Sequence, residues 1–385
     1  MRAFLATEHL GAVLLLVATV VALAWANSPW WHAYESFWHT EHVVSVGGFE
    51  QAFDLHAVAN DGLMTIFFFV IGLEITRELA VGELADRRAA ALPACAALGG
   101  MVVPALLFVV VNLSTGTTAG WGIPMATDIA FTLGVLALLG SRVPSGVKLV
   151  LLTLAVVDDV GAIVVIGVVY SSGLDARAGL AAVAVLGVVL VMRAVGVASW
   201  WPYVPVGVLL WWCVYRSGVH PTIAGVVLGL LAPARPTGGP GSTSVAERLE
   251  TGLHPWSSYL VLPLFALANA GVRLEPGALG RPASLAIGGG VVLGLVVGKT
   301  VGIAGGAWLA LRTGIGILPS DVSRRQLLGI GSLAGIGFTV SLFIAELAYP
   351  DQPRSGAAAK LGVLAAPCLA AAIGATLLVR STRAR

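Results

Sequence analysis

Four ionisable side chains stand near the middle of three long apolar runs of this 385-residue chain. They are Asp158 and Asp159 in the run 147–170, Asp128 in 118–139 and Lys299 in 284–312. Runs of this length cross a lipid bilayer as helices, and each of these residues falls close to the midplane of its run. Because a charged side chain costs about 2.5–3.5 kcal/mol at the centre of a membrane helix, the four positions are the main functional signal.

The adjacent pair indicates exchange chemistry. Neighbouring residues separate by about 100° around a helix, so Asp158 and Asp159 cannot both face one partner. One of them can pair with Lys299 while the other faces a water-filled cavity, where a carboxylate binds either a proton or a hard cation. Competition between the two for one carboxylate is the minimal chemistry of an antiporter. A purely structural ion pair would account for Lys299 and one acid but would leave two acids over.

The composition agrees with a membrane protein. Charged residues make up 11% of the chain and apolar residues 57%, with 48 glycines in addition. So few charges cannot cover a water-soluble surface, which excludes a soluble enzyme, a disordered chain and a nucleic-acid binder. The three cysteines have neither the spacing of a zinc site nor an even number that would indicate a disulfide framework.

The hydropathy pattern predicts an all-α polytopic membrane protein with about twelve spans in a single domain, 1–385. The predicted spans are 10–26, 57–78, 89–112, 118–139, 147–170, 176–196, 200–215, 218–233, 255–272, 284–312, 326–348 and 356–379. The first run imitates a cleavable signal peptide, but its single basic residue and the Trp at the supposed cleavage site favour retention as a span. Fifteen of the 22 Lys and Arg fall on one side, which predicts that both termini are cytoplasmic.

Two of the spans are predicted to be discontinuous. The run 118–139 has Gly120, Gly122 and Pro124 just before Thr127 and Asp128, and 326–348 carries four glycines in its first half. These spans are the middle members of two triplets, spans 3–5 and 10–12, and a separation of seven spans inverts the second triplet. Inverted repeats with two discontinuous helices crossing at the midplane are typical of secondary transporters.

Two further segments interrupt the helical pattern. Residues 42–53 alternate around Gly47 and Gly48, which predicts a small external β-hairpin. Residues 233–246 are polar and rich in Gly and Pro, and we expect them to form a flexible cytoplasmic loop.

Eight ordered motifs resemble the bacterial NhaA sodium/proton antiporters, over nearly the whole chain. The motifs are Asn60–Met64, Gly72–Leu79, Ala126–Gly134, Leu154–Ala162, Ser217–Thr222, Leu253–Trp256, Gly298–Lys299 and Gly335–Thr339. The resemblance implies an electrogenic exchanger that expels Na⁺ or Li⁺ in exchange for H⁺, is activated at alkaline pH, and needs no cofactor beyond these substrate ions. It also implies a homodimer joined through the hairpin 42–53, embedded in the lipid bilayer of the bacterial inner membrane.

The resemblance assigns roles residue by residue. Asp159 is the principal Na⁺- and H⁺-binding carboxylate with Thr127 as a hydroxyl ligand, and Asp158 is the second acid, paired with Lys299 in one state. Asp128 and Lys299 compensate the dipoles of the half-helices. The residues of a pH-sensing region are Glu74, Arg77, Glu78, Glu250 and His254. The family pattern has other residues where this chain has Thr251 and Glu247, which puts the pH threshold in question.

Two accessory positions have open interpretations. Asp61 and His220 match motif residues, but an interfacial helix cap and a packed histidine explain them equally well.

Among other functions, a sodium-coupled symporter of similar architecture is the closest competitor. A cation channel and an intramembrane aspartyl protease are remote: the first needs a continuous pore, and the second needs its two acids on different helices.

Overall fold

A computed structural model describes residues 2–46, 49–171, 173–197, 199–234, 243–274 and 280–383. The helices fall into two compact units. Unit 1 comprises residues 1–38, 83–162 and 262–385, and unit 2 comprises 39–82 and 163–261. The chain passes between the units four times: after Trp38, after Gly82, within α7 after Ala162, and at the junction of η6 and α12.

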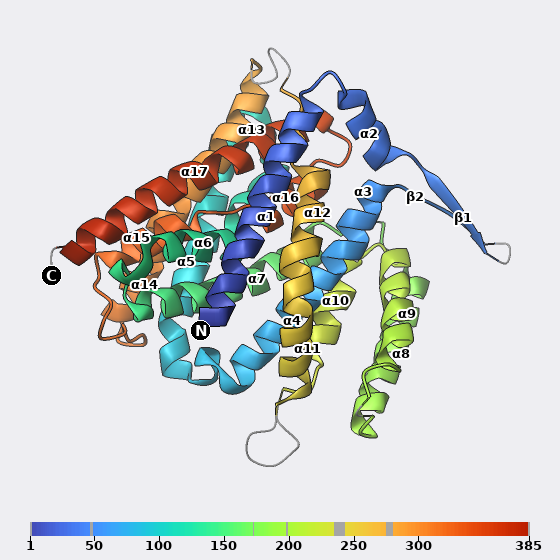
Figure 1. The fold of residues 1–385 in the computed structure, drawn as a ribbon, viewed down its shortest axis with the longest axis horizontal. Coiled ribbons are helices and arrows are strands. Elements are labelled where there is room, and N and C mark those ends of the chain that lie inside the picture. Colours follow the sequence, from blue (N-terminus) through green and yellow to red (C-terminus); the bar gives the residue numbers. More distant parts are fainter. Residues whose placement is uncertain are drawn as a thin grey trace. The chain divides into compact units, whose positions relative to one another are not determined.

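Unit 1 holds both predicted triplets apart from the last residues of α7. Its elements are α1 (Arg2–Ala26), α2 (Trp31–His39), η2 (Glu83–Ala85), α5 (Arg87–Asn112), η3 (Leu113–Thr115), η4 (Thr118–Met125), α6 (Ile129–Leu139), η5 (Gly140–Arg142), α7 (Ser145–Val169), α12 (Leu262–Asn269), α13 (Pro282–Leu293), η7 (Gly294–Gly298), α14 (Lys299–Arg312), α15 (Gln326–Ala334), α16 (Thr339–Ala348) and α17 (Pro353–Arg383). The long helix α17 packs against α13 and α15, and α14 packs along α5 (Figure 1).

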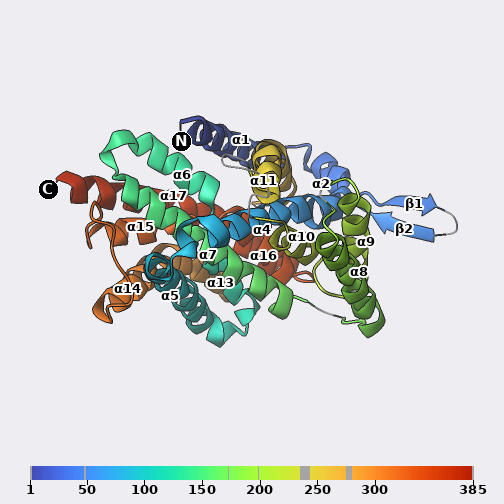
Figure 2. The same cartoon turned by 90° about the horizontal axis from the view of Figure 1, so that it is seen from below.

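Unit 2 contains the hairpin and a smaller set of helices. Its elements are β1 (His42–Val46), β2 (Phe49–Phe53), α3 (Leu55–Ala57), η1 (Val58–Leu63), α4 (Met64–Val81), α8 (Ala176–Ala194), α9 (Tyr203–Arg216), α10 (Thr222–Leu230), α11 (Val245–Trp256) and η6 (Ser257–Val261). The two strands are antiparallel, with His42 opposite Phe53, and they project beyond the helices of their own unit (Figure 2). The turn residues 47–48 lie outside the described residues.

The predicted all-α architecture is confirmed, and each predicted span contains helix. By length and composition six helices of the described chain can cross a membrane, or up to nine if each sharply bent pair is one span. The three remaining runs are shorter, since α9 and α10 have 14 and 9 residues and α12 has 8. Helix α2, in the predicted first external loop, is an element that the hydropathy pattern does not predict.

The predicted loop 233–246 is shorter than its pattern indicates. Ser244 caps α11 by accepting a hydrogen bond from the amide of Glu247 at 3.1 Å, so the helix already begins at Val245. Residues 235–242 of this loop lie outside the described residues.

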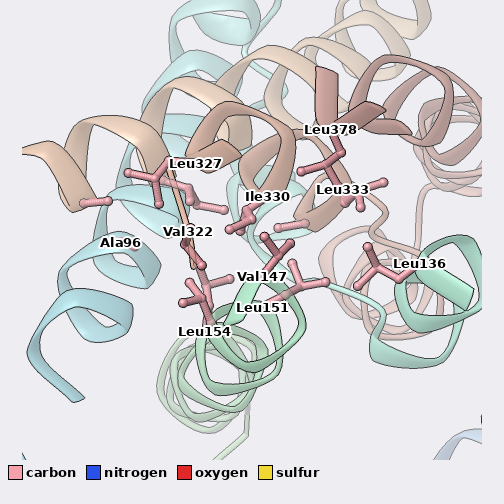
Figure 3. Close-up of a cluster of buried hydrophobic side chains, with 14 of the residues drawn as sticks. Ala96, Leu136, Val147, Leu151, Leu154, Val322, Leu327, Ile330, Leu333 and Leu378 are labelled. Atoms are coloured by element: carbon pink, nitrogen blue, oxygen red, sulfur yellow. The ribbon is translucent and has the colours of Figure 1, made fainter. Parts of the chain in front are cut away.

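The core of unit 1 packs α7 against α15. The contributing side chains of α7 are Val147, Leu151 and Leu154. They lie in one buried cluster with Leu327 and Ile330 of α15 (Figure 3). Residues three or four apart share one face of a helix, so this spacing directs one apolar stripe of each helix inward. The stripe on α7 continues to Val157, directly before the acid pair, so the core fixes the helix that carries both acids.

Candidate functional site

The two discontinuous spans face one another at their breaks. The span formed by η4 and α6 bends by 42°, and the one formed by α15 and α16 bends by 50°. The amide of Asp128 donates to the carbonyl of Ile336 at 2.7 Å, and the Ser341 hydroxyl donates to the carbonyl of Ile123 at 2.8 Å. Backbone groups released by the breaks therefore find partners within the protein, as membrane depth requires.

Glycine makes this close approach possible. A Cβ added at Gly337 would lie 2.7 Å from the carbonyl oxygen of Ala126 on the other broken span. A Cβ at Gly335 would collide with the carbonyl oxygen of Leu295. The glycine-rich sequence of the eleventh span thus serves both the break and the packing around it.

Asp128 caps two half-helices at once. Its Oδ1 accepts a hydrogen bond from the amide of Phe131 in the first turn of α6, at 3.0 Å. Its Oδ2 accepts from the amide and the hydroxyl of Thr339, at the start of α16, at 3.2 and 2.9 Å. Since a helix N-terminus carries partial positive charge, one carboxylate here lies against two positive ends.

Thr127 is the centre of the second group of contacts. Its hydroxyl lies 2.7 Å from Oδ2 of Asp158 and 2.9 Å from the carbonyl oxygen of Ala334, the last residue of α15. The Lys299 amine donates to the same hydroxyl at 3.0 Å and forms an ion pair with Asp158. Lys299, Asp158 and Thr127 are all buried. The cation thus lies close to the C-terminal end of α15, where partial negative charge gathers.

The position of Lys299 depends on unusually close helix packing. The π-helical segment η7 ends directly before Lys299, and glycines on the helix follow at every fourth residue. A Cβ at Gly298 would lie 2.7 Å from Cα of Pro104, and one at Gly302 or Gly306 would collide with backbone carbonyls of α5. The absence of side chains on this stripe lets α14 lie directly on the α5 backbone.

The acid pair retains capacity for an additional ligand. Within the described chain, Oδ1 of Asp158 is buried and has no hydrogen-bond partner. Asp159 is 4% exposed and lies close enough to interact electrostatically with Lys299. A buried oxygen without a partner is costly, and it is satisfied equally by a proton or by a hard cation. No group of three or more His, Cys, Asp and Glu side chains with metal-binding geometry occurs among the described residues.

The residues expected to sense pH lie together in unit 2. The Arg77 guanidinium binds both carboxylate oxygens of Glu250, at 2.9 and 3.1 Å, and lies 3.1 Å from Glu78. Glu74 interacts electrostatically with Arg77, and His254 with Glu250. Burial raises the pKa of Glu250 above its ordinary value, although the neighbouring Arg77 works in the opposite direction.

Asp61 and His220 also meet within unit 2. Nε2 of His220 lies 3.6 Å from a carboxylate oxygen of Asp61, while its Nδ1 lies 2.9 Å from the Thr222 hydroxyl. Asp61 stands in the π-helical segment η1, and Trp211 donates to its carbonyl at 3.1 Å. Both accessory residues therefore belong to one polar contact between η1, α9 and the segment that leads into α10.

The structure brings the predicted site residues together in two groups, one in each unit. Unit 1 holds Thr127, Asp128, Asp158, Asp159 and Lys299, and unit 2 holds the pH and accessory residues. No pattern in the sequence indicates that Thr339 or the Ala334 carbonyl belongs to the site. The sequence does signal a helix start at Thr339, because a hydroxyl residue directly after the glycine-rich break is typical of such a start.

Comparisons with known proteins find relatives that match nearly the whole chain. The family model described as Na⁺/H⁺ antiporter 1 matches residues 2–378. The chain is 46% identical to Na⁺/H⁺ antiporter NhaA 2 of Myxococcus xanthus, over 99% of this chain and 90% of that protein. It is 47% identical to the NhaA antiporter of an Acidovorax species (94% and 88%), and 44% identical to that of Rhodopirellula baltica (98% and 92%).

Proposed function

The chain belongs to the Na⁺/H⁺ antiporter 1 family, and we propose that Asp159, Asp158 and Thr127 form the site at which Na⁺ and H⁺ compete. The protein is a multi-pass membrane protein that exchanges sodium ions for protons; it is not an enzyme. Lithium is expected to substitute for sodium at the same site. The observation that carries the residue assignment is the buried junction of Lys299, Asp158 and Thr127, with one carboxylate oxygen left without a partner.

The arrangement supports a two-state cycle. In the proton-loaded state Asp158 and Asp159 each hold a proton, and release of both protons toward the alkaline side creates an anionic site beside the Thr127 hydroxyl. Sodium then binds to the carboxylates, the loaded site opens to the opposite side, and protons displace the ion. The facing breaks can accommodate this change, because the half-helices beside them are short, with 11, 9 and 10 residues in α6, α15 and α16.

The number of carboxylates favours electrogenic exchange. Two acids can accept two protons, whereas the single site that they form accepts one sodium ion. Exchanging two protons for one sodium ion moves one net charge, and a membrane potential contributes about 2.3 kcal/mol per charge per 100 mV. The potential of a respiring cell therefore drives sodium outward.

The cluster of Arg77 and Glu250 supports activation at alkaline pH. A carboxyl whose pKa is raised remains partly protonated at a higher pH than an ordinary glutamate. Raising the pH completes its ionisation and strengthens its pairing with Arg77, which changes the charge of α11 against α4. We place this cluster and both termini on the cytoplasmic side, in line with the distribution of Lys and Arg.

The hairpin supports a homodimer. Its two strands form a narrow two-stranded sheet whose outer edges have no partner strand among the described residues. An exposed edge offers unpaired amides and carbonyls to a second chain. We propose that two copies associate through residues 42–53, and crosslinking of Thr40→Cys protein in intact membranes provides the test.

The site assignment is tested by proton movement in everted membrane vesicles that are energised to be acid inside. Addition of Na⁺ or Li⁺, but not K⁺, is expected to alkalinise the lumen, most strongly at alkaline pH. Asp159→Asn should abolish this response, because an amide cannot exchange a proton for an ion. Asp351→Asn, which alters an exposed carboxylate between α16 and α17, is the matched control and should retain it. Normal exchange by well-inserted Asp159→Asn protein would contradict the assignment.

A further inference from the structure

Unit 1 contains a cavity that the exchange site does not use. The cavity has a volume of about 270 Å³ and lies where α5 and α7 begin, beside the loop that joins α14 to α15. Its walls are mostly apolar and include Leu92, Pro93, Leu149 and Ile317. The polar residues that line it are Asp86, Arg88 and Thr153.

Arg88 and Asp86 are the charged residues that line the cavity. The Arg88 side chain is exposed and forms no ion pair within the part of the chain that the structure describes. Asp86 keeps its negative charge, but its carboxylate is held at the start of α5, where it accepts a hydrogen bond from the backbone amide of Arg88 at 2.9 Å.

The apolar rim is open to the surroundings of the helices. Leu149 is 40% exposed and Ile317 61% exposed, although both are large apolar side chains. The buried wall, by contrast, is continuous with the core, because Leu92 belongs to the same cluster as the α7 residues of Figure 3. A ligand bound in the cavity would contact the packed helices on one side, and on the other side it would extend along the exposed apolar surface.

We propose that this cavity binds an anionic phospholipid of the phosphatidylglycerol class. The start of a spanning helix lies at the level of the lipid headgroups, where basic pockets between helices recognise lipid phosphates. The phosphodiester would accept hydrogen bonds from the Arg88 guanidinium. At about 270 Å³ the cavity is smaller than a typical site for a whole small molecule, roughly 300–1,000 Å³. It therefore accommodates only part of the lipid, and the acyl chains extend past Leu149 and Ile317.

Occupation of the cavity has a mechanical consequence for transport. The lipid would contact α5, which lies along the helix of Lys299, and α7, which carries Asp158 and Asp159. A bound lipid thus holds the beginnings of both helices at a constant separation. Exchange in reconstituted vesicles should accordingly be faster with phosphatidylglycerol than with phosphatidylcholine alone.

The binding test uses native mass spectrometry of the purified full-length protein in a neutral detergent, with equal amounts of phosphatidylglycerol or phosphatidylcholine. The wild type should retain phosphatidylglycerol preferentially. Arg88→Gln should weaken that retention about fivefold, the effect of one cation near a lipid surface. Arg142→Gln is the matched control, because it removes an exposed arginine of η5 that does not line the cavity. Ile317→Asp, at the exposed rim, should weaken retention as well.

Three results would overturn the proposal. Equal retention by Arg88→Gln and Arg142→Gln would show that the lipid binds by general charge and not at this cavity. Equal retention of both lipids by the wild type would show an apolar site without headgroup selection. Displacement of phosphatidylglycerol by millimolar inorganic phosphate would identify a site for free anions. The binding measurement needs no ion exchange, so its outcome is independent of the proposed transport site.

Discussion

Both units contain an Arg or Lys paired with a carboxylate, but the two pairs differ in their access to water. In unit 1 the side chains of Lys299 and Asp158 are fully buried. In unit 2 the side chain of Arg77 is 32% exposed and that of Glu250 is 15% exposed. A buried pair is costly to form and more costly to break, whereas a pair in contact with water contributes little to stability. The buried pair of unit 1 belongs to a site that must exchange ligands. The hydrated pair of unit 2 can gain or lose a proton without unfolding the helices around it.

The largest expected effect comes from breaking the buried pair. Lys299→Met leaves the Asp158 carboxylate buried without its cation, which should lower the free energy of unfolding by about 3–5 kcal/mol. Thermal unfolding of the detergent-solubilised protein measures the loss. Replacing Asp158 by Asn in the same protein should restore part of the stability but not the exchange activity.

Lys360 offers a matched control within the same unit. It pairs with Glu346 at 2.6 Å, and the two side chains are 15% and 33% exposed. Lys360→Met should therefore cost only about 0.2–1 kcal/mol, as for exposed pairs. If the two lysine variants lost equal stability, the contrast between buried and hydrated pairs would be wrong for this protein.

A second contrast concerns carboxylates that cap helices. Asp128→Asn should cost about 2–4 kcal/mol, because the charge interacts with two helix ends at up to about 2 kcal/mol each. The new amide group would also meet the donors of Thr339 where a carboxylate oxygen now accepts. In unit 2, Asp175 caps only α8 and is exposed, so Asp175→Asn should be nearly neutral. Unfolding of both variants at low ionic strength measures the difference.

The two units should respond alike where they use the same packing device. A Cβ at Gly302 in α14 or at Gly229 in α10 would meet the backbone of a neighbouring helix. Gly302→Ala and Gly229→Ala should each cost about 1–3 kcal/mol through overpacking. Gly305→Ala is the control, since no atom lies within 4 Å of its added Cβ, and it should be neutral or slightly stabilising. A large loss of stability in Gly305→Ala would show that any substitution in α14 is destabilising and that close helix packing is not the cause.

The smallest expected effect is a change in pH dependence. The folded protein raises the pKa of Glu250 above its ordinary value of 4.5, so ionisation of this group opposes folding. The corresponding stability is complete below pH 4.5 and is lost as the pH rises through the folded-state pKa. Glu250→Gln removes this dependence. As the pH rises through this range, the unfolding temperature of the variant should therefore increase relative to that of the wild type. Parallel curves for the two proteins would contradict the raised pKa.

Much of unit 1 could be predicted because membrane burial makes its signals strong. The depth of Asp158, Asp159 and Lys299 follows from their places in apolar runs, and the break at Thr127 follows from the nearby Gly and Pro residues. The contact of Thr127 with Ala334 joins residues 207 positions apart, and no periodicity in the sequence indicates such a pairing. The same holds for the contact of Asp128 with Thr339.

The ion-pair contacts of unit 2 are harder to predict from the sequence, for a related reason. These ion pairs stand at helix ends, where charged residues are common and carry little information. That Arg77 binds Glu250 depends on the packing of α11 against α4, which their separation by 173 residues conceals. The division of the chain into two units is hard to find in the sequence, because two of its four boundaries fall within α7 and between η6 and α12.

The Thr127 hydroxyl has more hydrogen-bond acceptors around it than it has hydrogen atoms to donate. It lies within hydrogen-bond distance of two acceptors, Oδ2 of Asp158 and the carbonyl of Ala334, but it carries a single hydrogen atom. The two acceptors therefore compete for one hydrogen atom. A ligand that withdraws negative charge from Asp158 would shift this balance toward the Ala334 carbonyl, so the charge of the acid and the end of the half-helix α15 are linked through one hydroxyl group.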